Sequence, residues 1–397
     1  MMDTTLPDIA PTVSVQHLAL RLPRGADRDY ALADLSFDLP AGEILCIVGE
    51  SGSGKSLCAQ TLMGLLPRAI SVERGAALFD GIDLIHVDAA TLRTLRGRRV
   101  GMIFQEPMTA LNPSMRIEDQ IMEVFEAHDL LTPPERRARA LDLAREVQLP
   151  DPERAIKAYP HQLSGGQRQR AMIAMALALE PALLIADEPT TALDVTTQAQ
   201  ILRLMREIQK RRNMAVIFIT HDFGVVSDIA DRVLVLEKGI VVEQGTAHDV
   251  LSNPQHPYTK ALLAAVPSGT PAIRPAEAEQ PVALSVANLN KSYRSKAGMF
   301  GAVRTVHAVK DVSFQIRRGR TLGLVGESGS GKSTVARLVT RINDPDSGTI
   351  ELGGQDYCAL RGEELRRQRS RIQMVFQDPF SSLNPRHKVG LSIADGP

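Results

Sequence analysis

The sequence predicts an α/β fold, present in two copies, in which phosphate-binding loops follow buried parallel strands. Three observations support this. The octet Gly49-Glu50-Ser51-Gly52-Ser53-Gly54-Lys55-Ser56 fits the pattern G-x-x-x-x-G-K-[ST]. Further strands are apolar throughout, as expected for strands that are buried on both faces of a parallel sheet. The octet then recurs unchanged as Gly326-Glu327-Ser328-Gly329-Ser330-Gly331-Lys332-Ser333.

The first octet has the local context that a phosphate-binding loop needs. The apolar residues 44–48 predict a buried strand before it, and residues 57–63 predict a helix after it. Its glycines let the backbone approach phosphate oxygens, and the amides at the helix start point towards the anion. We expect Lys55 to reach the β- and γ-phosphates of a nucleotide and Ser56 to ligate Mg²⁺. The second copy offers the same groups at Lys332 and Ser333, and adds a hydroxyl at Thr334.

The elements after the first loop are predicted from periodicity and turn residues. Residues 13–20, before the loop, alternate as an edge strand does, and residues 35–39 predict another strand. Residues 75–85 predict a strand pair, and 100–104 predict a strand that ends at Gln105. The region from residue 115 to 178 reads as mostly helical, with an amphipathic helix at 135–147.

Two apolar runs, residues 182–186 and 214–220, end at polar side chains. Asp187 and Glu188 follow the first run, and His221 follows the second. In an open α/β sheet the ligand lies beyond the carboxyl ends of the strands. These three side chains are therefore predicted to share one site with the phosphate-binding loop.

The chain repeats itself at an offset of 271 to 277 residues, as Ser14 with Ser285 and Asp34 with Asp311 show. A hairpin at 233–243 and a short helix at 255–266 close the first copy. We therefore predict a first domain over 1–266, a linker rich in Pro, Ala, Gly and Glu over 267–281, and a second domain over 282–397.

The composition describes a globular, core-forming protein. The 397 residues include 46 Lys and Arg and 46 Asp and Glu, so the net charge is zero, which argues against nucleic acid as a partner. No apolar run is long enough to span a bilayer, and no signal peptide is visible. The three cysteines, Cys46, Cys58 and Cys358, lack metal-site spacing and are expected to be reduced thiols.

The stretch Leu163-Ser164-Gly165-Gly166-Gln167 separates this chain from other proteins with such loops. Together with the two octets, it resembles the nucleotide-binding subunit of an ABC transporter. The resemblance implies a tandem P-loop NTPase fold, each copy having a RecA-like core, an antiparallel β subdomain and a helical signature subdomain, with the second copy incomplete. ATP and Mg²⁺ are the implied cofactors, and the implied activity is ATP hydrolysis coupled to transport.

The resemblance also implies roles for the residues that match its motifs. Asp187 would hold Mg²⁺ through water, and Glu188 would be the general base for the attacking water. Gln105 resembles the Q-loop glutamine, which contacts Mg²⁺ or water, and His221 resembles the switch histidine that touches the γ-phosphate. Asp194 resembles the D-loop aspartate. In the second copy, Gln377 takes the position of Gln105.

The signature residues are expected to serve a different nucleotide from the one held by Lys55. In ABC dimers the signature loop of one half covers the ATP on the phosphate loop of the other, so Ser164, Gly165, Gly166 and Gln167 would act on another domain in trans. The adenine-stacking aromatic is Tyr293 in the second copy. The first copy has Leu22 at that position, and nearby Tyr30 is either a substitute or an ordinary structural tyrosine.

The segment His256-Pro257-Tyr258-Thr259-Lys260-Ala261-Leu262 resembles the C-terminal signature of oligopeptide, dipeptide and nickel importer ATPases. This implies permease subunits and, through them, a solute-binding protein as partners, at the cytoplasmic face of the inner membrane. Peptides, or a related small solute such as nickel, would be the cargo. Residues 263–280 contain no cysteine, so no iron–sulfur cluster is expected. The alternatives are a soluble tandem ABC ATPase that acts on ribosomes or DNA and a nucleotide-binding fragment with little turnover.

The second copy departs from the family pattern, because its signature loop, magnesium carboxylate, base and switch histidine would fall beyond about position 430 by the repeat offset. Two explanations are open. The chain is a truncated product, which we favour, or two chains pair through their first domains and exchange Ser164 loops. In either case we expect the 397-residue chain alone to hydrolyse ATP weakly.

Overall fold

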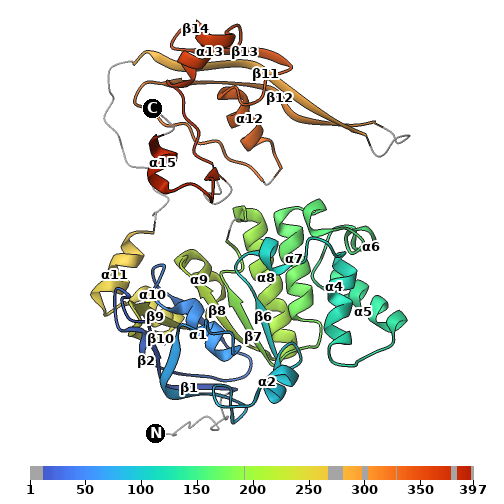
Figure 1. Ribbon diagram of the computed structural model, residues 1–397, viewed down its shortest axis with the longest axis vertical. Coiled ribbons are helices and arrows are strands. Elements are labelled where there is room, and N and C mark those ends of the chain that lie inside the picture. Colours follow the sequence, from blue (N-terminus) through green and yellow to red (C-terminus); the bar gives the residue numbers. More distant parts are fainter. Residues whose placement is uncertain are drawn as a thin grey trace, which may run out of the picture. The chain divides into compact units, whose positions relative to one another are not determined.

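The computed structural model describes residues 12–191, 193–266, 280–296, 303–327, 329–376 and 382–394. It divides into two compact units, Met1–Pro271 and Ala272–Pro397, each of which is described by itself (Figure 1). Two predicted site residues, Ser328 and Gln377, lie outside the described residues, as does the linker from 267 to 279.

The first unit is built on one mixed sheet with the strand order β5-β4-β1-β2-β10-β9-β3-β8-β7-β6. An antiparallel part, β5-β4-β1-β2, joins a mainly parallel part through a single pairing of Ile240 with Asp34. The strand bounds are β1 Val13–Arg21, β2 Tyr30–Leu39, β3 Ile44–Val48, β4 Ser71–Phe79, β5 Ile82–Asp83, β6 Val100–Ile103, β7 Leu183–Asp187, β8 Ala215–Thr220, β9 Arg232–Glu237 and β10 Ile240–Thr246.

The parallel strands β3, β8 and β7 are buried over their whole lengths, as their apolar runs predict. Successive residues of β3 enter different cores: Cys46 packs into the cluster on one face of the sheet and Ile47 into the cluster on the other. Strand β3 pairs in parallel register with β8, and β8 with β7. Their carboxyl ends therefore meet at one edge, where the candidate site lies.

The prediction of an edge strand at residues 13–20 is wrong. Strand β1 lies inside the antiparallel part, because it pairs with β2 on one side and with β4 on the other. The alternation of residue types that suggested an edge reflects burial, and burial carries no information about how many neighbours a strand has. Val13, Val15, Leu18 and Leu20 are inaccessible to solvent or nearly so, and Ser14 and Ala19 between them are buried as well.

The helices of the first unit fall into two groups. Helices α4 to α7 gather on the β6 side of the unit, with α7 in contact with β6 (Figure 1). They confirm the predicted helical region and form the helical subdomain. The bounds are α1 Lys55–Leu62, α2 Ala89–Leu95, α3 Pro107–Ala110, α4 Ile117–Glu126, α5 Pro133–Glu146, α6 Pro152–Ala155, η1 Pro160–Gln162, α7 Gly165–Ala176, α8 Val195–Arg212, α9 Phe223–Ile229, α10 Ala247–Ser252 and α11 Pro257–Ala264.

The second unit repeats the antiparallel part as a sheet with the order β12-β11-β13-β14. Its core includes Leu289, Leu338 and Ile350, all of which are fully buried. No helix within the described ranges of either unit has the length and apolar character needed to cross a bilayer. The bounds are β11 Val282–Lys296, β12 Val303–Arg317, α12 Lys332–Val339, β13 Ser347–Leu352, β14 Gln355–Asp356, α13 Gly362–Arg369 and α15 Val389–Ala394.

Candidate functional site

The first phosphate-binding loop lies between the end of β3 and the start of α1, as its sequence context predicts. Two of its glycines are required by close approaches. A Cβ on Gly49 would lie 2.1 Å from the carbonyl oxygen of Leu236, and one on Gly54 would lie 2.6 Å from that of Ala31. Gly54 has φ of 104° and is the N-cap of α1. A side chain at either position would therefore collide with a neighbouring backbone carbonyl.

Lys55 folds back over its own loop. Its Nζ donates to the carbonyl oxygens of Gly49 and Glu50, both at 2.8 Å, and the residue is only 5% exposed. Burial lowers the pKa of Lys55, an effect that the carboxylates of Glu188 and Asp187 oppose. A bound nucleotide phosphate would take the place of the two backbone carbonyls as the partner of Lys55. Because the phosphate carries a full negative charge, it is a better partner for a buried ammonium.

A hydroxyl and a carboxylate converge beside this lysine. Ser56 Oγ donates to Asp187 Oδ1 at 3.1 Å, joining α1 to the end of β7. Burial raises the pKa of Asp187, and the hydrogen bond from Ser56 only partly offsets this. An oxygen pair of this kind suits Mg²⁺, which keeps several waters and takes one or two protein oxygens together with phosphate oxygens. In the described part of the chain, no group of three His, Cys, Asp or Glu side chains could hold a metal ion by itself.

Glu188 is the centre of a side-chain cluster drawn from three loops. Its Oε2 accepts from Gln105 Nε2 and from Thr191 Oγ1, both at 3.0 Å, and its Oε1 lies 3.1 Å from His221 Nδ1. The backbone of Glu188 has φ of 45°, and its amide donates to Ile219 O at 2.9 Å. A left-handed conformation is uncommon for glutamate, although Glu180 on the surface also adopts it with φ of 55°.

These residues surround one cavity of about 430 Å³. The predicted residues Gly49, Glu50, Ser51, Gln105, Glu188 and His221 line it, joined by Phe223 and Leu262. The structure thus brings together the loop of the first octet, the Q-loop glutamine, the catalytic glutamate and the switch histidine that the sequence suggested. Thr191, Phe223 and Leu262 were not predicted: Thr191 reaches Glu188 through a local turn, Phe223 follows two residues after His221, and Leu262 is brought to the site by the tertiary fold.

The loop also has three supports that sequence reasoning missed. Arg28 donates to the carbonyl oxygen of Gly52. The amide of Gly239, in the β9–β10 turn, donates to Ser53 O at 3.0 Å. The amide of Glu50 donates to the phenolic oxygen of Tyr258 at 3.1 Å. None of these three partners is near the octet in sequence, so no local sequence pattern predicts their contacts with the loop.

The signature residues Ser164, Gly165, Gly166 and Gln167 lie at the start of α7 and do not line this cavity. Ser164 and Gln167 form a reciprocal capping box, with Ser164 Oγ accepting from the amide of Gln167 at 3.3 Å. A Cβ on Gly166 would lie 2.6 Å from Thr197 Cγ2. Asp194 in turn binds Thr197, accepting from its amide at 3.0 Å and its hydroxyl at 2.8 Å. Gly166 of the signature stretch and Asp194 therefore both lie against Thr197.

The two candidate adenine-stacking tyrosines make contacts of their own. Tyr30 donates to Glu73 Oε1 at 2.7 Å, and the Arg21 guanidinium lies over its ring. Tyr293 Oη accepts from Asn343 Nδ2 at 2.9 Å. Neither tyrosine is among the residues that line the cavity at Glu188.

The second octet repeats the geometry of the first within its own unit. Lys332 Nζ donates to the carbonyl oxygens of Gly326 and Glu327, both at 2.6 Å. Gly331 is the N-cap of α12, with φ of 98°, where Gly54 caps α1 with φ of 104°. The helix that begins at Lys332 carries Ser333 and Thr334, while Gly329 and Ser330 precede it in the loop.

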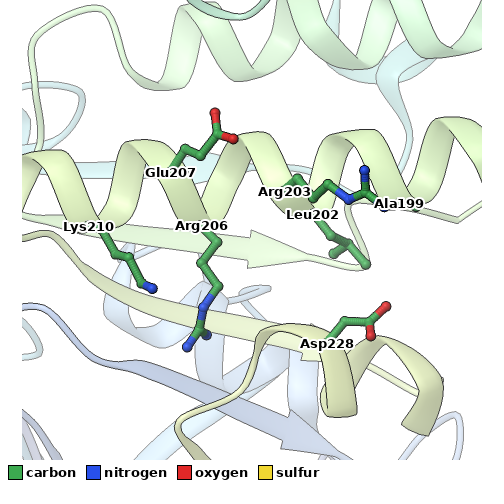
Figure 2. Close-up of a pocket in the computed structure, with 7 residues that line it drawn as sticks. All are labelled: Ala199, Leu202, Arg203, Arg206, Glu207, Lys210 and Asp228. Carbon is green, nitrogen blue, oxygen red and sulfur yellow. The ribbon is translucent and has the colours of Figure 1, made fainter.

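A second cavity, of about 390 Å³, lies between α8 and α9 and shares no residue with the first (Figure 2). One of its polar residues, Arg206, has a structural role. Arg206 donates to the carbonyl oxygen of Ile229 and, at 3.0 Å, to Asp231, which also accepts from the amide of Ile44 at the start of β3. The lining residues are Ala199, Leu202, Arg203, Arg206, Glu207, Lys210 and Asp228.

Comparison with known proteins shows the family. The ABC transporter family model matches residues 32–191 and 309–392, and the model of the oligopeptide/dipeptide transporter C-terminal region matches 242–294. The chain belongs to the ABC transporter ATP-binding proteins, of the oligopeptide/dipeptide type. This supports the importer interpretation over an ABC ATPase that acts on ribosomes or DNA.

Two relatives illustrate the similarity. The chain is 47% identical over 388 residues to the peptidoglycan transport ATP-binding protein YejF of Agrobacterium fabrum, covering 97% of this chain and 70% of the relative. It is 44% identical over 419 residues to the glutathione import ATP-binding protein GsiA of Escherichia coli strain K12, covering 98% of this chain and 67% of the relative.

Solved structures agree with the fold. The dimeric ABC transporter cassette MJ0796 aligns with a TM-score of 0.53 at 28% identity, over 59% of this chain and 98% of that one. A post-hydrolysis state of the same cassette, bound to ADP and phosphate, gives the same score at 29% identity. The cassette cbiO1 of Clostridium perfringens also gives 0.53. The fold class predicted from the sequence is confirmed, and the chain is an ATPase of the ABC type.

Proposed function

We propose that the first domain binds Mg²⁺ and ATP between the Lys55 loop and Glu188 and hydrolyses the ATP to drive uptake of peptides. The observation that supports this best is the cluster on Glu188. Three side chains from separate loops, Gln105, Thr191 and His221, fix one carboxylate beside the loop that would hold the γ-phosphate. Gln105 and His221 line the same cavity as Gly49 and Glu50, whose carbonyl oxygens bind Lys55.

In this proposal each residue has a chemical role. The attacking water lies against Glu188, which takes a proton as the oxygen bonds to the γ-phosphorus and the bond to ADP breaks. Lys55 offsets the negative charge on the leaving and transferred groups, and His221 contacts the γ-phosphate. Ser56, Asp187 and Gln105 would hold Mg²⁺, whose charge would stabilise the phosphates. In the second domain, Ser333 and Gln377 are the proposed counterparts.

The proposed partners follow from the family. The chain works with membrane permease subunits and, through them, a solute-binding protein, as a peripheral protein on the cytoplasmic side of the membrane. Peptides are the proposed cargo, because the C-terminal segment matches the oligopeptide/dipeptide type and the relatives are named for peptidoglycan transport and glutathione import. A second ABC domain in trans would complete the nucleotide site.

The test replaces Glu188 by glutamine, which keeps the shape and removes the base. Turnover of ATP is expected to fall by at least about 100-fold, the usual contribution of a general base, while ATP stays bound. The matched control is Glu180→Gln, because Glu180 forms a surface ion pair with Arg139 at 2.8 Å and lies outside the cavity. Phosphate release and retained [α-³²P]ATP measure the two effects. Unchanged turnover in Glu188→Gln would remove Glu188 from its proposed role.

A further inference from the structure

Helix α11 reaches the phosphate-binding loop directly. It belongs to the segment that matches the oligopeptide/dipeptide transporter C-terminal region, about 200 residues beyond the loop in the chain. Tyr258 Oη accepts a hydrogen bond from the amide of Glu50 at 3.1 Å. One turn later, Leu262 forms part of the wall of the cavity that holds Glu188 and His221.

The amide that Tyr258 binds belongs to the same stretch of backbone that Lys55 binds. Lys55 Nζ donates to the carbonyl oxygens of Gly49 and Glu50, so the peptide groups at 49–51 are held from both sides. Strand β9 also lies close to this backbone, since a Cβ on Gly49 would lie 2.1 Å from the carbonyl oxygen of Leu236. A change at Tyr258 is therefore transmitted to the backbone that positions the Lys55 ammonium.

Helix α11 is itself held in a fixed place. Glu243 of β10 accepts from the amides of Gln255 and His256, at 2.7 and 3.0 Å, just before the helix begins. Thr259 is fully buried, and Tyr258, Leu262 and Leu263 pack against the larger core cluster of the unit. The half-buried Tyr258 is thus presented to the loop by a helix packed on the core, although its hydrogen bond with the Glu50 amide is exposed to solvent.

We propose that Tyr258 is a positioning residue of the ATP site, through which the C-terminal importer segment holds the first phosphate-binding loop in its nucleotide-binding shape. The inference rests on the proposed role of the Lys55 loop as an ATP site. It assigns to α11 a function in nucleotide affinity, in addition to any contact that the segment makes with partners. The hydroxyl, and not the ring, carries this function.

The chemistry of the phenol fits the contact. Burial raises the pKa of Tyr258, so the hydroxyl remains neutral at physiological pH and accepts the amide hydrogen through a lone pair. Tyr258→Phe removes this acceptor and keeps the ring that packs on the core. Because a neutral hydrogen bond of this kind is modest in net strength, ATP affinity is expected to fall by about 2- to 10-fold.

The experiment uses the full chain carrying Lys332→Ala, so that nucleotide binding reports on the first loop. Binding of TNP-ATP and its displacement by ATP with Mg²⁺ give Kd, and hydrogen–deuterium exchange resolved to single residues follows the Glu50 amide. Tyr258→Phe is expected to weaken ATP binding and to speed exchange at Glu50, with exchange in α11 unchanged. Tyr159→Phe is the matched control, since its ring stacks on His161 and it makes no described contact with the loop.

Unchanged Kd and unchanged exchange at Glu50 would overturn the inference. Faster exchange throughout α11 would also overturn it, because the hydroxyl would then serve the folding of the helix and not the position of the loop. Lys55→Ala separates the premise from the inference. If that variant still binds TNP-ATP as tightly as the parent chain, the proposed function of the loop fails and the inference fails with it, whatever Tyr258→Phe shows.

Discussion

Asp187 is 6% exposed at the end of β7, and burial raises the pKa of its carboxyl. The folded protein therefore binds the Asp187 proton more tightly than the unfolded chain does. Ionisation of this group costs stability, and the cost appears as the pH rises through the raised pKa. Without bound metal, the carboxylate that would serve Mg²⁺ is a destabilising charge, with the hydrogen bond from Ser56 as partial compensation.

Asp187→Asn should therefore raise the melting temperature of the nucleotide-free protein at neutral pH and abolish Mg²⁺-dependent turnover. The expected gain is a few degrees, since about 1 kcal/mol shifts the melting temperature of a domain of this size by about 2–4 °C. The gain should vanish at low pH, where the aspartate is protonated in both states. Thermal unfolding followed by circular dichroism between about pH 2.5 and pH 8 measures it, since an unfolded aspartate has a pKa of about 3.9.

Asp228→Asn is the control, because Asp228 is exposed and lines the cavity between α8 and α9. Its melting temperature should follow that of the unchanged protein at every pH. If Asp187→Asn melts at or below the temperature of the unchanged protein at neutral pH, burial does not dominate the ionisation of Asp187.

The core of the candidate site could be predicted from the sequence because its residues follow strands or belong to a loop with a recognisable spacing. Asp187, Glu188 and His221 come directly after buried strands, and Lys55 has its octet. Thr191 could not be predicted in this way. It reaches Glu188 through a turn in which the glutamate takes a left-handed backbone conformation. Neither the residue composition nor the hydrophobic periodicity of the sequence predicts that turn.

At the scale of elements, the two copies share a bulge in the first described strand of each unit, β1 and β11. His17 in β1 and Asn288 in β11 have φ of 48° and 51°. Their amides donate to Ser36 Oγ and Ser313 Oγ, both at 2.9 Å. Opposite each bulge is a glycine, Gly75 with φ of 99° in one sheet and Gly348 with φ of 102° in the other. The two copies therefore share this bulge and its facing glycine as well as their sequence motifs.

Gly75→Ala should destabilise the first unit by about 3 kcal/mol or more, since strain at positive φ adds to overpacking. A Cβ on Gly75 would lie 2.5 Å from Leu18 Cα and 2.6 Å from the carbonyl oxygens of Gln16 and His17. Urea unfolding monitored by circular dichroism measures the loss.

Gly81→Ala provides the comparison, because Gly81 has φ of 80° but no atom within 4 Å of an added Cβ. It should cost only about 1 kcal/mol, the strain of the backbone alone. Equal losses in the two variants would show that the bulge does not depend on the close approach at Gly75.

The sequence predicted which segments form strands better than it predicted which strands pair. Buried strands such as β7 and β8 are recognisable because every residue is apolar, and this property is local. The position of β1 between β2 and β4 depends on pairing with residues up to about 60 positions away, for which a one-sided alternation gives no signal. The same reason explains why the support of the loop by Tyr258 was not predicted.

At the scale of the whole molecule, the signature loop of the first unit lies outside the cavity beside its phosphate loop, and we predict that the two loops serve different nucleotides. Ser164 is exposed at the start of α7 and is not among the residues around the cavity at Glu188. Its hydroxyl is engaged in the capping box with Gln167. The family fold is described as a dimer in the aligned cassette. A site that uses both Lys55 and Ser164 therefore needs two domains that face each other.

Mixing two inactive variants tests whether these domains come from two chains. In a Lys332→Ala background, Lys55→Ala leaves Ser164 intact, and Ser164→Arg leaves Lys55 intact. A two-fold pair of one chain of each kind contains one complete site. An equal mixture should regain about one quarter of the parental turnover, because half of the randomly formed pairs combine the variants and each such pair has one intact site of two.

Steady-state phosphate release, measured across mixing ratios at a fixed total protein concentration, gives the recovery, which should be greatest at the equal mixture. A mixture of Lys55→Ala with the double variant Lys55→Ala, Ser164→Arg contains no complete site and should stay inactive. Absence of recovery at every ratio would contradict pairing of two first domains. Turnover by Ser164→Arg alone, independent of its concentration, would show instead that Ser164 is not part of the nucleotide site.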